Sequence, residues 1–105
     1  MRFEIMLAPD AGKSLQRLPA RIRSEVRDAL ERHLRFEPTK TSKSRIKRLR
    51  GLRQPQYRLR GNDIRVFYDV TETSVEILAI IEKQEAQAWL DQQGTPGESG
   101  GPGQG

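Results

Sequence analysis

The sequence predicts an α+β domain: an N-terminal strand, a helical hairpin, an antiparallel sheet of three to four strands and a short C-terminal helix. Apolar residues alternate with polar ones near the N-terminus, recur at helical spacing up to Leu34, and alternate again from Tyr57 to Val70. The chain has 105 residues, enough for one hydrophobic core and no second domain. We expect the domain to span residues 1–92 and a disordered Gly/Pro-rich tail to span residues 93–105.

The first half of the chain predicts a strand followed by two helices. Phe3 and Ile5 belong to the alternation of a strand over about residues 2–7. Pro9 favours the start of a helix, because the first turn of a helix does not need the backbone N–H that proline lacks. Leu18-Pro19 is expected to end this helix. The next helix has one apolar stripe, formed by Ile22, Val26, Ala29, Leu30 and Leu34.

The second half predicts the sheet. Ile46 and Leu49 allow only a short strand, whereas Tyr57 and Leu59 lead into a turn at Gly61-Asn62-Asp63. The strand after the turn directs four apolar residues to one face: Ile64, Val66, Tyr68 and Val70. Residues 75–81 are rich in β-branched and apolar side chains, which predicts a central strand buried on both faces. A last helix over about residues 83–91 would be anchored to the sheet by Trp89.

Positive charge is concentrated in one segment. Residues 40–65 carry ten basic residues and one acidic residue, a net charge of +9, which leaves −4 for the rest because the whole chain has +5. Such asymmetry predicts a surface for an anionic partner, the alternative being that these side chains only solvate strands and a loop. The basic residues are Lys40, Lys43, Arg45, Lys47, Arg48, Arg50, Arg53, Arg58, Arg60 and Arg65.

The composition also limits which kinds of catalytic and metal-binding site the chain can form. The sequence has no cysteine and a single histidine, which excludes disulfides, thiolate catalysis and a Cys/His metal site, and we expect neither a metal nor a cofactor. It has neither a signal peptide pattern nor a run of about 20 apolar residues. We therefore expect a cytoplasmic protein without a membrane partner.

Two runs carry a resemblance to a known family. In the predicted order of elements, the run Lys47-Arg48-Leu49-Arg50-Gly51-Leu52 and the run from Tyr57 to Val70 resemble the RelE/ParE toxin superfamily, over about residues 3–90. The resemblance implies the toxin component of a type II toxin–antitoxin system, neutralised by a cognate antitoxin protein. It also implies that operator DNA is bound only through the toxin–antitoxin complex.

The resemblance leaves three functions open. The RelE-like branch implies a metal-free endoribonuclease that enters the ribosomal A site, cuts mRNA by attack of a ribose 2′-hydroxyl on the adjacent phosphate, and so inhibits translation. The ParE-like branch implies inhibition of DNA gyrase by binding. The third possibility is a non-toxic regulatory or degenerate member.

For the nuclease, the resemblance places Arg58 and Arg65 where that branch carries catalytic or phosphate-clamping residues. Both are expected to bind phosphate and to stabilise the transition state, and Arg65 is expected to be exposed, so that Arg65→Ala would leave the fold intact. Lys83 stands in for one basic residue of the C-terminal pair and is the third catalytic candidate. The wider RNA-binding track would be Arg45, Lys47, Arg48, Arg50 and Arg60.

The sequence departs from the nuclease branch at two places. Gln56 replaces a basic residue before the hairpin, and the stretch from Glu82 to Trp89 lacks the arginine and tyrosine of that branch. Lys83 or Glu82 would take up proton transfer, unless each is only a solvated residue at a strand end. The general acid and the general base therefore stay open.

Overall fold

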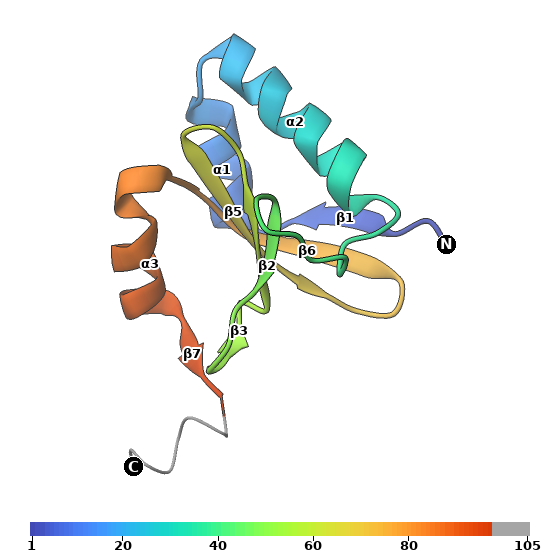
Figure 1. Cartoon of the computed structure of the whole chain (residues 1–105). Coiled ribbons are helices and arrows are strands. Elements are labelled where there is room, and N and C mark those ends of the chain that lie inside the picture. Colours follow the sequence, from blue (N-terminus) through green and yellow to red (C-terminus); the bar gives the residue numbers. More distant parts are fainter. Residues whose placement is uncertain (98–105) are drawn as a thin grey trace.

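Residues 1–97 of the computed structural model are described, and their main element is a five-stranded sheet with the order β1-β6-β5-β4-β2 (Figure 1). β5 and β6 pair antiparallel, as do β4 with β5 and β2 with β4, whereas β1 pairs with β6 in parallel. The predicted antiparallel sheet is therefore confirmed, with β1 added at its edge. The strands are β1 (Glu4–Leu7), β2 (Ile46–Arg48), β4 (Tyr57–Arg60), β5 (Ile64–Val70) and β6 (Ser74–Glu82).

The predicted helical hairpin covers one face of this sheet. Helix α1 (Pro9–Arg17) begins at the proline, and α2 (Ala20–Leu34) follows Pro19, as the sequence indicated. Their apolar stripes pack against the alternating apolar residues of β4, β5 and β6. Each fully buried Leu or Val there stabilises the fold by about 1.5–3 kcal/mol, so this layer is the main source of stability.

Tyr68 lies at the centre of the core. It is fully buried, its ring stacks on that of Tyr57 at 5.5 Å between centroids, and its hydroxyl donates to the carbonyl oxygen of Pro38 at 2.7 Å. Burial raises the pKa of the Tyr68 hydroxyl, which therefore stays protonated and donates this bond. Tyr68 therefore belongs to the core, as its place in the alternation of apolar residues predicted.

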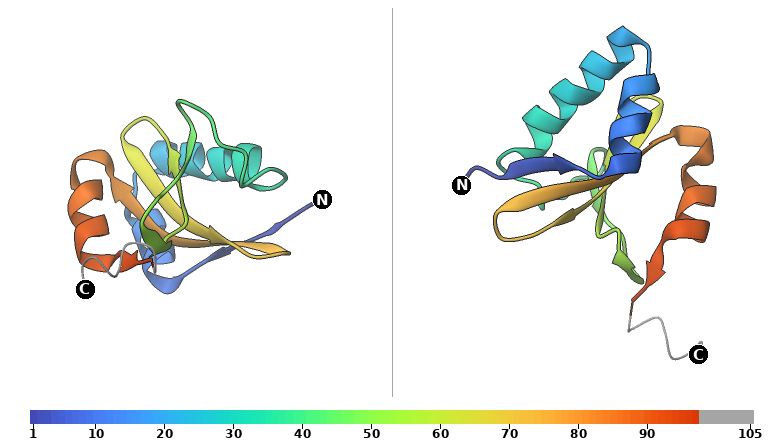
Figure 2. Two further views of the ribbon diagram at one scale, coloured as in Figure 1. Left: turned by 60° about the horizontal axis from the view of Figure 1, so that its bottom comes forward. Right: turned by 180° about the vertical axis from the view of Figure 1, so that it is seen from behind.

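The C-terminal elements lie on the opposite face. β6 leads through a 3-10 turn, η1 (Lys83–Glu85), into helix α3 (Ala86–Gln93), which Figure 2 shows apart from helix α2. Trp89 anchors this helix, because its ring stacks on the buried ring of Phe67 at 5.0 Å between centroids. None of the helices in the described part of the chain could cross a membrane.

The chain after α3 returns to the middle of the sequence. β7 (Thr95–Pro96) pairs antiparallel with β3 (Leu52–Gln54), and the Gly97 N–H donates to the Gly51 carbonyl at 2.9 Å. Thr95, Pro96 and Gly97 fall within the segment predicted as a disordered tail, of which residues 98–105 lie outside the described part.

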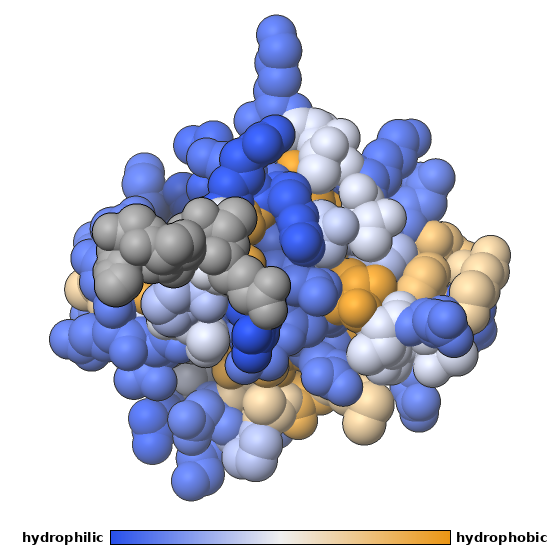
Figure 3. All heavy atoms as spheres, turned by 90° about the horizontal axis from the view of Figure 1, so that it is seen from below, coloured by the Kyte–Doolittle hydropathy of each residue, from blue (hydrophilic) through white to orange (hydrophobic). Residues whose placement is uncertain are grey.

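Seen from below, the surface is largely hydrophilic, with apolar residues in small separate areas (Figure 3).

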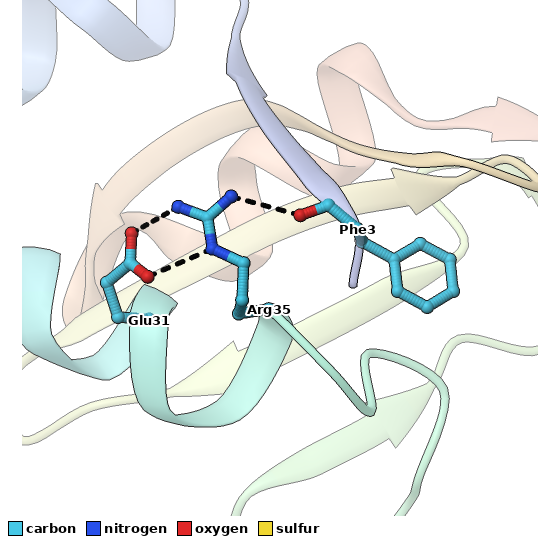
Figure 4. A network of polar contacts seen from close by, with 3 residues as sticks. All are labelled: Phe3, Glu31 and Arg35. Carbon is cyan, nitrogen blue, oxygen red and sulfur yellow. Dashed lines mark hydrogen bonds and ion pairs between the residues drawn. The ribbon is translucent and has the colours of Figure 1, made fainter. Parts of the chain in front are cut away.

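A polar network fixes β1 to the end of α2 (Figure 4). The Arg35 guanidinium donates from Nε to Glu31 Oε1 at 2.9 Å, forms a second bond to Oε2 of the same carboxylate, and donates to the Phe3 carbonyl at 3.0 Å. The Phe3 N–H donates in turn to the Arg35 carbonyl at 2.7 Å. The hydrogen bond from Arg35 lowers the pKa of the Glu31 carboxyl. The start of the edge strand β1 is therefore held both by the Arg35 side chain and by its backbone carbonyl.

Candidate functional site

Three arginines gather on the sheet face opposite the helical hairpin. In register, Arg60 of β4 lies beside Arg65 of β5, and Arg58 lies beside Phe67. Because directly paired residues direct their side chains to the same face, Arg58, Arg60 and Arg65 form one arginine cluster. Lys47 of β2 is paired with Arg58 and extends the cluster toward the edge of the sheet.

Arg58 is the most unusual member of the arginine cluster. Its side chain is partly buried, and its Nε atom is inaccessible and has no hydrogen-bond partner within the described residues. Burial lowers the pKa of Arg58, and the nearby charges of Arg65 and Arg60 lower it further. A buried donor without an acceptor, surrounded by like charges, is a site that an anion would complete.

The burial of Arg65 differs from the expectation that this side chain is exposed. It is only 7% exposed, and its Nη1 donates to the carbonyls of Ile64 at 3.1 Å and Gly61 at 3.3 Å. The expectation of an exposed Arg65 is wrong, because its guanidinium lies against the carbonyls of the β4–β5 turn on a sheet face where Trp89 of α3 also stacks on Phe67. Arg65 therefore holds the β4–β5 turn, and Arg65→Ala would remove structural bonds as well as charge.

The remaining predicted phosphate binders do not form one track. Arg45 Nη1 donates to the Arg60 carbonyl at 2.9 Å, which fixes the end of β4. Arg48 is paired with Tyr57 and lies over its ring, 5.1 Å from the centroid, on the face opposite the arginine cluster. Arg50 is exposed beside the positive-φ turn at Gly51. Of these predicted residues, Lys47 and Arg60 are the ones that pair in register with Arg58 or Arg65.

The candidates for proton transfer lie at the end of β6. Lys83 is exposed, and its backbone N–H donates to the Asp63 carbonyl at 2.7 Å, which brings it next to the β4–β5 turn. Glu82 is paired with Ile64 and accepts a bond from the Gln84 amide at 3.1 Å. Glu82 therefore faces the hairpin side of the sheet, away from the arginine cluster.

Gln56 has a structural role that the sequence did not indicate. Its backbone N–H donates to Asp69 Oδ1 at 2.8 Å, and its Oε1 accepts from the Val70 N–H at 2.9 Å. Asp69 Oδ2 also accepts from the Gln54 amide at 2.7 Å. An amide oxygen can accept the hydrogen bond from the Val70 N–H, whereas a lysine or arginine side chain has no acceptor, which gives a physical reason for glutamine at this position.

Two hollows flank the sheet. A groove of about 690 Å³ separates α2 from the β4–β5 turn, and a pocket of about 430 Å³ lies between the β2–β3 segment and α3. Within residues 1–97 no group of three or more acidic or histidine side chains could hold a metal ion. The groove has an apolar floor that includes Leu18, Ile22, Val26, Ala29, Leu59, Ile64 and Val66.

Solved structures identify the fold as that of RelE-type toxins. The RelE–RelB complex from Pyrococcus horikoshii matches with 30% identity and a TM-score of 0.57, over 79% of this chain and 97% of that chain. The RelBE2 toxin–antitoxin complex from Mycobacterium tuberculosis matches with 24% identity and a TM-score of 0.61, over 78% and 99%. The YoeB dimer from Staphylococcus aureus matches with 16% identity and a TM-score of 0.53, over 77% and 97%.

The sequence is also matched by a family model. Residues 5–87 match the model described as the ParE toxin of the type II toxin–antitoxin system parDE. The chain therefore belongs to the RelE/ParE-type toxins, and the resemblance drawn from the two sequence runs is confirmed. Among curated proteins none matches the sequence.

Proposed function

We propose that this toxin is a ribosome-dependent mRNA endoribonuclease that uses the arginine cluster to hold the scissile phosphate. The observation that carries the proposal is the buried, unpartnered Nε of Arg58 among like charges. A phosphate would accept a hydrogen bond from the Nε–H of Arg58, and its negative charge would also offset the repulsion among the arginines. The ribosomal A site as the target would place the action in the cytoplasm.

The proposed reaction needs no covalent enzyme intermediate. The ribose 2′-hydroxyl loses its proton to water as its oxygen forms a bond to the adjacent phosphorus. The bond from phosphorus to the 5′-oxygen breaks and that oxygen takes up a proton, giving a 2′,3′-cyclic phosphate and a 5′-hydroxyl. Arg58 and Arg60 would neutralise the growing charge on the phosphoryl oxygens. Arg65 would act by holding the β4–β5 turn, and Lys83 at the end of β6 is the candidate to protonate the leaving 5′-oxygen.

The test is growth arrest combined with primer extension on cellular mRNA. Arrest with ribosome-dependent cuts by the wild type, loss of the cuts in Arg58→Met, and retention in Arg27→Met would support the proposal. Arg27 is an exposed arginine on α2, so it controls for the loss of one charge. Cuts that persist unchanged in a folded Arg58→Met protein would remove the arginine cluster from the reaction.

Inhibition of DNA gyrase is the second candidate function. It is favoured by the match to the ParE model and by the structural use of Gln56 where the nuclease branch has a basic residue. Growth arrest without mRNA cuts, together with inhibition of gyrase supercoiling by the purified chain, would select this function. If the chain causes neither growth arrest nor inhibition of supercoiling, the result would select the regulatory or degenerate role.

A cognate antitoxin is the expected partner in each case, as in the RelE–RelB complexes that match the fold. We infer that it places an apolar helix in the groove between α2 and the β4–β5 turn, and an acidic segment on the basic face. Operator DNA would then be contacted through the antitoxin. The ionic part of this interface predicts weaker binding at high salt, and an affinity unchanged over a tenfold range of salt would contradict it.

A further inference from the structure

The large apolar side chains that are exposed in the described part of the chain gather around β1. Met6 and Leu7 belong to this strand and are 49% and 41% exposed. Met1 precedes the strand, and Phe36 directly follows Arg35, whose side chain binds the start of β1. Apolar surface of this kind, collected at one edge of a sheet, indicates a contact with another protein surface.

The backbone of β1 is open on its outer side. The strand pairs with β6 on one side and forms the edge of the sheet on the other (Figure 1). The Glu4 N–H donates to the Thr73 carbonyl at 2.9 Å, so Glu4 and Met6 direct their backbone groups toward β6. Because successive residues of a strand alternate in this respect, Ile5 and Leu7 direct their N–H and carbonyl groups to the open edge.

The open stretch of β1 is short because it is bounded at both ends. At one end, the N–H of Phe3 donates to the Arg35 carbonyl, and the Phe3 carbonyl accepts from the Arg35 side chain. At the other end, Pro9 begins α1 and turns the chain away from the sheet. A long strand from another protein would run into Arg35 or α1, whereas a strand that is as short as β1 and also turns away at Pro9 fits the space.

The other edge of the sheet is protected from such pairing. β2 forms that edge and carries Lys47 and Arg48, both of which are exposed. Two copies that met along β2 would set these cations against each other, and charged side chains on an edge strand commonly prevent pairing. The β1 edge carries Met6 and Leu7 instead, so it is the edge that favours contact.

We propose that two copies of this chain pair antiparallel along β1, around a two-fold axis at Met6. Ile5 of one copy then lies opposite Leu7 of the partner subunit, and the two residues exchange both of their outward backbone hydrogen bonds. Since Ile5 packs on the core of its own subunit, its exposed side is covered by the partner's Leu7. The two Met6 side chains meet directly at the axis, on the face opposite the helical hairpin.

The ends of the paired strands are complementary in charge. Arg2 and Asp10 are both exposed and lie at equal distances along the chain on either side of Met6. The two-fold axis therefore brings the Arg2 end of each copy to the Asp10 end of the other, with attraction at both ends. Because both strands are short, we expect a weak dimer whose share rises with protein concentration.

The pairing is independent of the proposed function. The arginine cluster lies on β4 and β5, and β6 separates these strands from β1. Two copies joined along β1 would leave both arginine clusters open. The inference therefore holds whichever ligand the arginine cluster takes, and it adds an interface between copies to the surfaces already described.

The test is sedimentation equilibrium of the full chain over about a hundredfold range of concentration. The wild type should pass from monomer toward dimer as the concentration rises. Met6→Lys and Met6→Glu should each self-associate at least tenfold more weakly, because like charges then meet at the axis. An equimolar mixture of these two variants should dimerise at least tenfold more tightly than either variant alone, since lysine then faces glutamate.

Gln92→Lys and Gln92→Glu are the matched controls, because Gln92 is exposed on α3, and both should dimerise like the wild type. Hydrogen exchange at the Ile5 and Leu7 amides should slow as the dimer forms. A wild type that stays monomeric throughout, Met6 variants that dimerise like the wild type, or a mixture no tighter than its components would each overturn the proposal. Exchange at these two amides that is unchanged in a chain that does dimerise would overturn it as well, because the interface would then lie elsewhere.

Discussion

Replacing Arg58 by methionine should make the protein more stable and less able to bind anions. A buried donor without a partner costs about 1–3 kcal/mol, and the Nε of Arg58 is such a donor. Methionine keeps a similar unbranched stem, so most of the packing along the side chain is retained. Since part of the guanidinium still contacts water, we expect a gain of about 1 kcal/mol, or about 4–8 °C in Tm for a domain of this size.

The assay is thermal unfolding of the wild type, Arg58→Met and Arg60→Met. Arg60 is exposed on the same strand, so its replacement should change the stability by less than about 0.5 kcal/mol. Sulfate, which resembles phosphate, should raise the Tm of the wild type more than that of Arg58→Met, because an anion that binds only the folded site stabilises it. Equal or lower stability of Arg58→Met, or an equal sulfate effect, would refute the reasoning.

Three further predictions concern the core, the pH dependence and the partner surface. Tyr68→Phe leaves the buried Pro38 carbonyl without its donor and should cost about 1–2 kcal/mol in urea unfolding; an unchanged midpoint would contradict this. The pKa of Glu31 is lowered by its bond to Arg35, so the pair stabilises the fold above the ordinary pKa of 4.5 and loses its effect as the pH falls through the lowered value. The stability difference between the wild type and Glu31→Gln should therefore shrink as the pH is lowered from neutral to well below 4.5, and a constant difference would exclude the pair as its source. Ile22→Asp puts a charge into the groove of α2 and should weaken antitoxin binding at least tenfold while mRNA cutting by the free toxin persists; equal antitoxin affinity would place the interface elsewhere.

Local patterns were sufficient to predict most of the fold. The helix boundaries followed from Pro9 and Pro19, and the alternation from Ile64 to Tyr68 identified the face that packs on the hairpin. The parallel pairing of β1 with β6 had no signal in the sequence, because it depends on residues far apart in the chain. Likewise, Thr95 and Pro96 have the composition of a tail and become a strand only because β3 lies within reach.

The candidate site was predicted in part. The pairing of strands across the Gly61 turn brings Arg58 close enough to Arg65 for the two charges to repel, as the turn chemistry indicated. The burial of Arg65 was missed, because its contacts with the carbonyls of the β4–β5 turn follow from the folded turn and not from the alternation of residue types. The role of Gln56 was missed for a related reason, since a bond between its side chain and the backbone of β5 follows from pairing geometry and not from residue type.

The pairing of β1 with β6 has a consequence for biosynthesis. Glu4 is translated 70 residues before its partner Ser74, since 74 − 4 = 70. Contacts between distant residues form late, and the N-terminal strand must wait for a partner while the rest of the chain is still being added. A fragment released from the ribosome before residues 74–82 are made would lack β6, which joins β1 to β5 in the sheet. The strands that carry the arginine cluster would then have no central strand to pair with.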